Sequence, residues 1–274
     1  MIRAFKYFIT GSTASLLMVT SAFAQSGIAE TVRNFDEEIQ TMVKRIEDKN
    51  TPSRRTALAW ILHDAAQDAF SKLLDKPKAS QFSKDQHLDA LSTAYSYSKK
   101  ATELNQDTAE FWRLYGAINM FNKGGPISAI EAEGAFLRVL EIMPTDLQAR
   151  KNLITIFMQS GDYDSAIPQF QFLMNNHPDY FTQSQLDTAF MAYTLSEHTY
   201  EGVNDVKAML MRKPALANAN LLIAMLQRAQ GDHEASLQTV KMLYSGSYPA
   251  PVSSEIKQRA RQLEQQWKTL GAIQ

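Results

Sequence analysis

The feature that most constrains the fold of this chain is a pattern of residues that returns at a fixed interval. Gly161-Asp162-Tyr163 is matched by Gly231-Asp232-His233, 70 residues further along. Pro178 lies 34 residues after Pro144 and 36 residues before Pro214, so two units of nearly equal length fit inside the longer interval. A chain that repeats itself in this way is predicted to fold as a stack of similar supersecondary units.

Each unit is predicted to be two antiparallel helices joined by a tight turn. Gly161 and Gly231 supply the conformational freedom that the turn requires. A small residue is expected on the second helix where the helices approach closely, and a large apolar residue four positions later faces the core. The small residues are Ala132, Ala166 and, more weakly, Ser236, and the large ones are Phe136, Phe170 and Val240. The three prolines end the second helices.

Composition and periodicity favour helices elsewhere in the chain. The 274 residues include only 11 Gly and 9 Pro and are 45% hydrophobic, which suits helices better than a loop-rich β-sandwich. Apolar residues spaced three and four apart predict amphipathic helices at 29–48, 54–74 and 253–269. A loop is expected over 76–83, followed by a helix that ends near residue 104. The sequence therefore predicts an all-α protein.

One unit carries the signature of a known repeat. Trp112-x2-Tyr115-Gly116 is followed by Ala132, Phe136 and Pro144. This arrangement resembles the tetratricopeptide repeat (TPR), whose units of about 34 residues begin with W-x2-L-G. The resemblance implies a right-handed α-α superhelix, a TPR solenoid of about four to five helical hairpins with an N-terminal helix and a C-terminal capping helix. A generic helical bundle or another α-solenoid is the alternative.

The expected organisation divides the chain into five parts. Residues 1–24 are a signal peptide, 25–52 an N-terminal helix and 53–107 one or more degenerate helical hairpins. Residues 108–248 hold TPR-like repeats at about 109–146, 147–180, 181–214 and 215–248, and residues 249–274 form the capping helix. The unit at 181–214 is expected to be degenerate, because it has Gly202 at the small position but no glycine in its turn.

The first 24 residues have the order of an export signal. Arg3 and Lys6 give a positive start, a moderately apolar stretch follows, and Ala22-Phe23-Ala24 precedes Gln25. This order predicts cleavage after Ala24 and a periplasmic product. The chain contains no Cys, so a lipoprotein anchor at the new N-terminus is excluded. No later stretch is apolar enough to predict a membrane span. An uncleaved anchor is the alternative.

The sequence offers no recognisable constellation for catalysis, a metal or a cofactor. The five histidines lie at least 21 residues apart, and H-E-x-x-H, G-x-S-x-G and Gly-rich phosphate-binding motifs are absent. Lys and Arg number 28 against 29 Asp and Glu, with no long basic tract, which argues against nucleic acid as a partner. We therefore expect a protein without enzymatic activity.

In the TPR family, the first helix of each unit lines a concave groove that holds a partner's peptide or helix. That register gives nine candidate groove residues: Arg113, Met120, Lys151, Asn152, Met158, Gln185, Tyr193, Met225 and Arg228. The cations would hold carboxylates, and the methionines would offer a pliant apolar surface or pack against the neighbouring hairpin. Lys151 and Asn152 match part of the family's clamp for a C-terminal carboxylate, but Thr155 departs from it.

The favoured function is an exported scaffold that binds a protein or peptide partner in this groove, in envelope assembly or secretion. A periplasmic holdase-type chaperone is the first alternative. An enzyme, or the regulatory subunit of one, is the second and less favoured. The sequence leaves the partner and the oligomeric state open.

Overall fold

The computed structural model describes residues 34–122 and 126–271, and over these ranges its secondary structure is entirely helical. The helices are α1 (Phe35–Asp48), α2 (Pro52–Leu74), α3 (Lys76–Ala79), α4 (Lys84–Leu104), α5 (Ala109–Phe121), α6 (Pro126–Ile142), α7 (Leu147–Ser160), α8 (Tyr163–Asn176), the 3₁₀ helix η1 (Pro178–Tyr180), α9 (Gln183–Leu195), α10 (Thr199–Arg212), α11 (Ala219–Ala229), α12 (His233–Ser245) and α13 (Ser254–Gly271). The expected loop at 76–83 contains the short helix α3. The predicted signal peptide lies outside the described residues.

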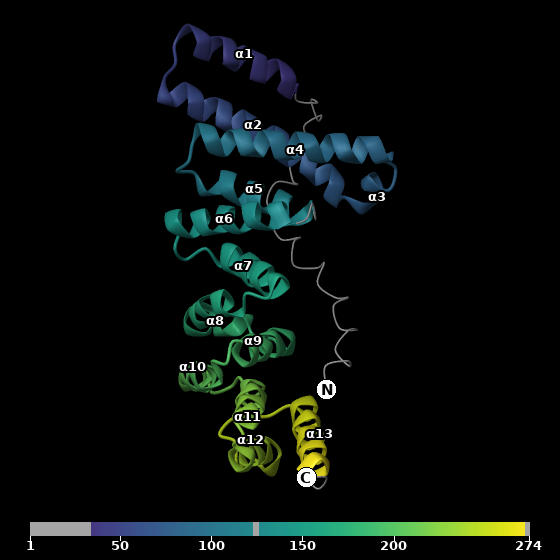
Figure 1. Ribbon diagram of the computed structural model, residues 1–274, viewed down its shortest axis with the longest axis vertical. Helices are drawn as coiled ribbons and strands as arrows, with labels where there is room; N and C mark the ends of the chain where they lie inside the picture. The colour runs from purple at the N-terminus through teal and green to yellow at the C-terminus, as the bar shows by residue number, and fades with distance from the viewer. Residues whose placement is uncertain (1–33, 123–125, 272–274) are drawn as a thin grey trace.

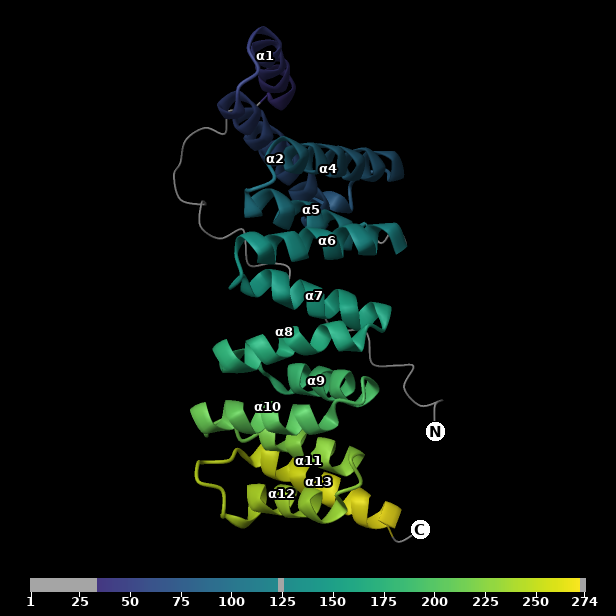
Figure 2. The same cartoon turned by 60° about the vertical axis from the view of Figure 1, so that its left-hand side comes forward.

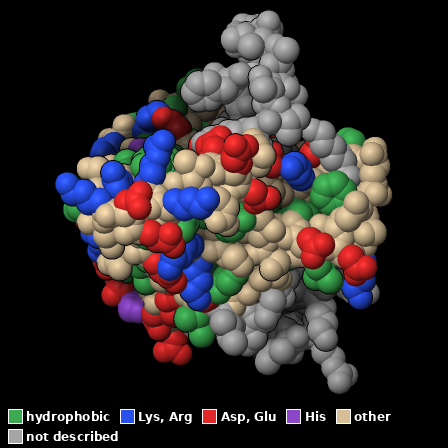
Figure 3. All heavy atoms as spheres, turned by 90° about the horizontal axis from the view of Figure 1, so that it is seen from above, with side chains coloured by type: hydrophobic (Ala, Val, Ile, Leu, Met, Phe, Trp, Pro, Cys, Tyr) green, Lys and Arg blue, Asp and Glu red, His purple; other side chains and the backbone are tan. Residues whose placement is uncertain are grey.

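The helices stack in chain order into an elongated molecule, with the α1–α2–α4 layer at one end and α11, α12 and α13 at the other (Figures 1 and 2). Four hairpins form the body of the stack: α5–α6, α7–α8, α9–α10 and α11–α12. Figure 3 looks down on the α1 end. Within the described ranges, no helix is long and apolar enough to cross a bilayer.

The Gly-Asp pairs make the hairpin turns in the way that the sequence predicts. Gly161 and Gly231 have φ angles of 80° and 83°, in the left-handed region that ends a helix without a steric penalty only for glycine. The aspartates that follow then begin the second helices. Asp162 accepts a hydrogen bond from the Ser165 amide at 3.2 Å, and Asp232 accepts one from the amide three residues after it at 3.1 Å.

The predicted contact positions between the helices are buried. Ala132, Ala166, Ser236, Phe136, Phe170 and Val240 are each no more than 1% exposed. Two first-unit residues show how tight this packing is, because a Cβ at Gly116 would lie 2.8 Å from the Phe136 ring. The glycine of the Trp-x2-Tyr-Gly signature is therefore needed for helix approach rather than for backbone freedom.

The hairpin α9–α10 keeps the repeat geometry without the repeat sequence. Glu197 stands 36 residues after Gly161 and takes the same left-handed turn conformation, with φ 63°. α7 begins three residues after Pro144, whereas α9 begins five residues after Pro178, because η1 intervenes. Two extra residues therefore precede α9, and each α9 residue corresponds to the α7 residue 36 positions earlier.

Candidate partner-binding face

The first helix of each hairpin presents four residues, three or four apart, on one side of the stack. They are Glu110, Arg113, Ala117 and Met120 in α5; Gln148, Lys151, Thr155 and Met158 in α7; Ser184, Asp187, Met191 and Thr194 in α9; and Asn218, Leu221, Met225 and Arg228 in α11. We call the surface formed by these residues the first-helix face. It is the structural counterpart of the predicted groove.

Arg113 on this face is held by carboxylates of the chain itself. Its guanidinium lies 2.7 Å from Asp146 and 3.3 Å from Glu110. Asp146 is the N-cap of α7 and also accepts the Ala149 amide at 2.7 Å. Arg113 therefore joins the first two hairpins, and its charge is largely satisfied within the chain.

The other two predicted cations lie over aromatic rings. The Lys151 ammonium is 4.7 Å from the centre of the Tyr180 ring, and the Arg228 guanidinium is 5.7 Å from the Trp267 ring. Both contacts are cation–π interactions, which stabilise a charge without neutralising it. Within the described residues, no carboxylate forms an ion pair with Lys151, so this cation keeps the capacity to bind one.

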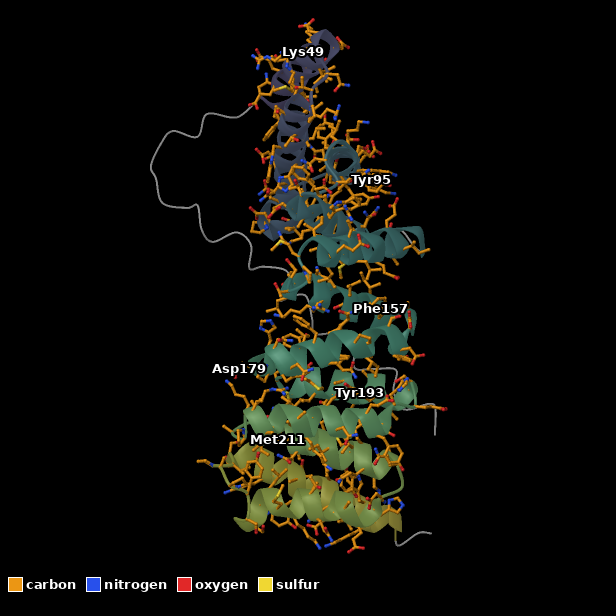
Figure 4. All side chains as sticks on the ribbon, turned by 90° about the vertical axis from the view of Figure 1, so that its left-hand side faces the viewer. Lys49, Tyr95, Phe157, Asp179, Tyr193 and Met211 are labelled. Atoms are coloured by element: carbon orange, nitrogen blue, oxygen red, sulfur yellow. The ribbon has the colours of Figure 1, made fainter. Side chains whose placement is uncertain are left out.

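Asn152 and Tyr193 were predicted to line the groove, and the structure shows that this placement is wrong. Asn152 is 7% exposed and accepts a hydrogen bond from Gln148 at 3.0 Å. Tyr193 is fully buried, and its hydroxyl donates to Asp205 at 2.8 Å. It lies within the stack, whereas Met211 points away from it at the edge (Figure 4). Burial and the neighbouring carboxylate raise the pKa of Tyr193, so its hydroxyl stays protonated.

The two-residue insertion before α9 explains the Tyr193 error. Tyr193 corresponds to the buried core residue Phe157, and the face positions of α9 fall on Ser184, Asp187 and Met191 instead. Sequence reasoning missed these three, although the 36-residue spacing of Pro178 and Pro214 carried the signal. Gln185, also predicted for the groove, caps α9 by accepting the Thr182 amide at 3.2 Å.

The predicted methionines are partly buried. Met120 and Met158 pack at the edge of the main core, and Met225 packs in the C-terminal cluster. Met191, which the prediction missed, is 41% exposed. The pliant apolar part of the face therefore centres on α9, beside the exposed Thr155 of α7.

The last helix covers the C-terminal part of the first-helix face. Leu221 is fully buried and Met225 is partly buried in a cluster that includes Ala260 and Trp267 of α13. Together with the Arg228–Trp267 contact, this packing places α13 against three face positions of α11. The helix is steeply inclined to the others in Figure 1.

α13 also reaches past α11 to the next first helix. Arg259 of α13 pairs with Asp187 of α9 at 3.0 Å, across 72 residues of sequence. The first-helix face is thus occupied at α11, bridged at Asp187, and uncovered by described residues over much of α7 and α9 around Lys151, Thr155 and Met191.

Similar chains were sought among protein families, curated proteins and solved structures. No protein-family model and no curated protein matches the sequence. A Naa15/Naa10 complex bound to HypK-THB is similar, with a TM-score of 0.49 and 16% identity, over 87% of this chain and 34% of that one. YrrB, described as a TPR protein with an unusual peptide-binding site, is similar over 82% of this chain and 99% of its own, with a TM-score of 0.45 and 15% identity. A TPR protein from Parabacteroides merdae gives a TM-score of 0.32 and 16% identity, over 84% of this chain and 92% of that one.

The chain spans about a third of the Naa15/Naa10 chain that it matches. The hairpins themselves define the fold, because their left-handed turns at Gly161, Glu197 and Gly231 follow one another at 36 and 34 residues and each is followed by a second helix that packs through a small residue. The chain therefore has the fold of a tetratricopeptide-repeat protein.

Proposed function

We infer that this chain is an exported scaffold that holds a protein or peptide partner on the first-helix face. The observation that carries this proposal is α13. The chain's own amphipathic helix already lies on the face at α11, through Trp267, Ala260 and an arginine that reaches Asp187. A surface that binds a helix in one hairpin is chemically suited to bind a similar segment in the hairpins beside it.

The residues left uncovered describe the partner segment. Met191 and Thr155 would take apolar side chains, and methionine adapts to different shapes. Lys151 would pair with a carboxylate, since its only described neighbour of this kind is a ring. We therefore expect an amphipathic segment with an acidic residue close to its apolar side, lying along α7 and α9 next to α13.

A comparison of matched surface variants tests this proposal. The double change Thr155→Glu with Met191→Glu places charge in the uncovered face, and we expect it to lower the amount of partner that co-purifies with the tagged chain at least about tenfold. Met211→Glu is the control, because Met211 is 78% exposed on α10, away from the face. Equal partner recovery from both proteins would contradict the proposal.

The export part of the proposal depends on the signal-like residues 1–24 and has its own test. We expect N-terminal sequencing of the chain recovered from the periplasmic fraction to begin at Gln25. We also expect Ala22→Leu with Ala24→Leu to block processing, because the peptidase site requires small residues. A mature protein that still begins at Met1, or one that stays in the cytoplasmic fraction, would refute it.

A further inference from the structure

The α1 end of the stack is only partly closed. α1 packs through Ile39, Met42 and Val43 against Leu58 and Leu62, which belong to the first half of α2. α1 has 14 residues and α2 has 23, so the second half of α2 extends past the covered part. Solenoids need their terminal layers covered, since each layer exposes an apolar face toward the next.

A cleft opens where this cover is missing. It has a volume of about 910 Å³ and lies between the start of α1, the second half of α2 and the first half of α4. Small residues form its floor, with Ala65 and Ala69 from α2 and Ala90 from α4, and Phe82 and Tyr97 contribute rings. Small floor residues allow another helix to approach closely, and the rings offer apolar contact to its side chains.

The rim of the cleft is acidic. Asp36, Asp68 and Asp89 come from three different helices, and among the described lining residues Lys72 is the one cation. Lys72 is already paired with Asp68 at 2.6 Å. Asp36 and Asp89 are exposed and have no cationic partner within the described ranges. Basic side chains gather on one side of this end of the molecule in Figure 3, where they leave the charge of the cleft uncompensated.

We propose that this cleft is a second docking site, which takes a cationic amphipathic helix from a partner protein. The helix lays its apolar side on Ala65, Ala69 and Ala90, and its Lys or Arg side chains pair with Asp36 and Asp89. It completes the terminal layer that α1 covers only in part. The site is independent of the first-helix face, whose occupied end, at α13, is at the opposite end of the stack.

Fluorescence anisotropy with designed peptides tests the site on the full chain. The probe is a labelled Leu/Ala/Lys peptide of about 18 residues that forms an amphipathic helix, and a second peptide carries Glu in place of every Lys. The protein variant is Asp36→Lys with Asp89→Lys. The control is Glu234→Lys with Glu255→Lys, which changes the net charge equally at the other end of the stack. All four positions are exposed, and circular dichroism checks that each variant keeps its helix content.

We expect one Lys peptide to bind per chain, about tenfold weaker in the cleft variant and within about twofold of the original in the control. The Glu peptide should not bind. Equal weakening in both variants would show attraction to bulk charge alone and overturn the proposal. So would self-association lost in the cleft variant, which would make a second copy the occupant. Much tighter peptide binding after removal of residues 1–33 would also overturn it, because the occupant would then be the chain's own segment.

Discussion

Two glycines in second helices have opposite surroundings, and this difference gives a paired prediction. A Cβ on Gly202 would lie 2.7 Å from the Tyr193 ring and 3.0 Å from Leu226, and the buried ring has no room to move. A Cβ on Gly134 would meet nothing within 4 Å. We expect Gly202→Ala to lower the free energy of unfolding by about 1–3 kcal/mol, and Gly134→Ala to raise it by about 0.5–1 kcal/mol through helix propensity. Urea denaturation measures both, and similar shifts in the two variants would contradict the packing described.

The turn residue Glu197 gives a second prediction at this scale. Its φ of 63° is unfavourable for a side chain but not for glycine. Glu197→Gly should therefore stabilise the protein by about 0.5–1 kcal/mol, and Gly161→Ala should destabilise it by a similar amount. Glu197→Ala is the control, since it removes the carboxylate and keeps the Cβ. If Glu197→Ala stabilised as much as Glu197→Gly, the effect would come from charge rather than from backbone strain.

Single residues also show what the sequence could predict. The buried positions Ala132, Phe136 and Ala166 followed from the repeat spacing, because helix contact requires small and large residues at fixed offsets. Tyr193 did not, because an insertion of two residues rotates every following side chain of a helix by about 200°. Its partner Asp205 lies in the next helix, and sequence periodicity does not report such contacts.

At the scale of elements, α13 is attached by a polar network that depends on pH. The Glu264 carboxylate accepts hydrogen bonds from Lys268, at 2.7 Å, and from Tyr244 of α12. These bonds, that from Lys268 first, lower the pKa of Glu264. A carboxyl with a lowered folded-state pKa stabilises above its ordinary pKa, and this contribution is lost as the pH falls through the folded-state pKa. α13 should therefore loosen in acid.

Hydrogen exchange of the α13 amides measures this loosening. Between about pH 7 and about pH 3.5, exchange corrected for the intrinsic rate should accelerate more in α13 than in α7. Glu264→Gln should make α13 exchange faster at neutral pH and remove the extra acid response. Thr269→Ala, on the same helix and outside the network, is the control. An unchanged acid response in Glu264→Gln would contradict this role.

The position of α13 was the part of the fold that the sequence could least define. Its apolar spacing predicted a helix at 253–269, close to Ser254–Gly271. Amphipathicity says that one side is buried but does not say against which helix. The pair Arg259–Asp187 joins residues 72 apart, and the consequence, that Met225 and Arg228 are covered rather than open, follows only from the three-dimensional arrangement.

At the scale of the whole molecule, the stack has three distinct regions. The α1 end carries an acidic cleft, the α11 end is covered by α13, and the first-helix face of α7 and α9 lies between them. Because repeat proteins are stabilised mainly by contacts between neighbouring units, changes at one end should leave the other end folded. The two proposed sites can therefore be tested independently in one chain.

Site-specific photo-crosslinking tests the central claim, partner binding on the first-helix face, most directly. A photoreactive residue is placed at Thr155 or Met191, or at Met211 as a control, in the chain within its native envelope, and the products are identified by mass spectrometry. The account predicts that one and the same partner is crosslinked from Thr155 and Met191 and not from Met211. A partner crosslinked from Met211 and from neither position on the face would contradict it.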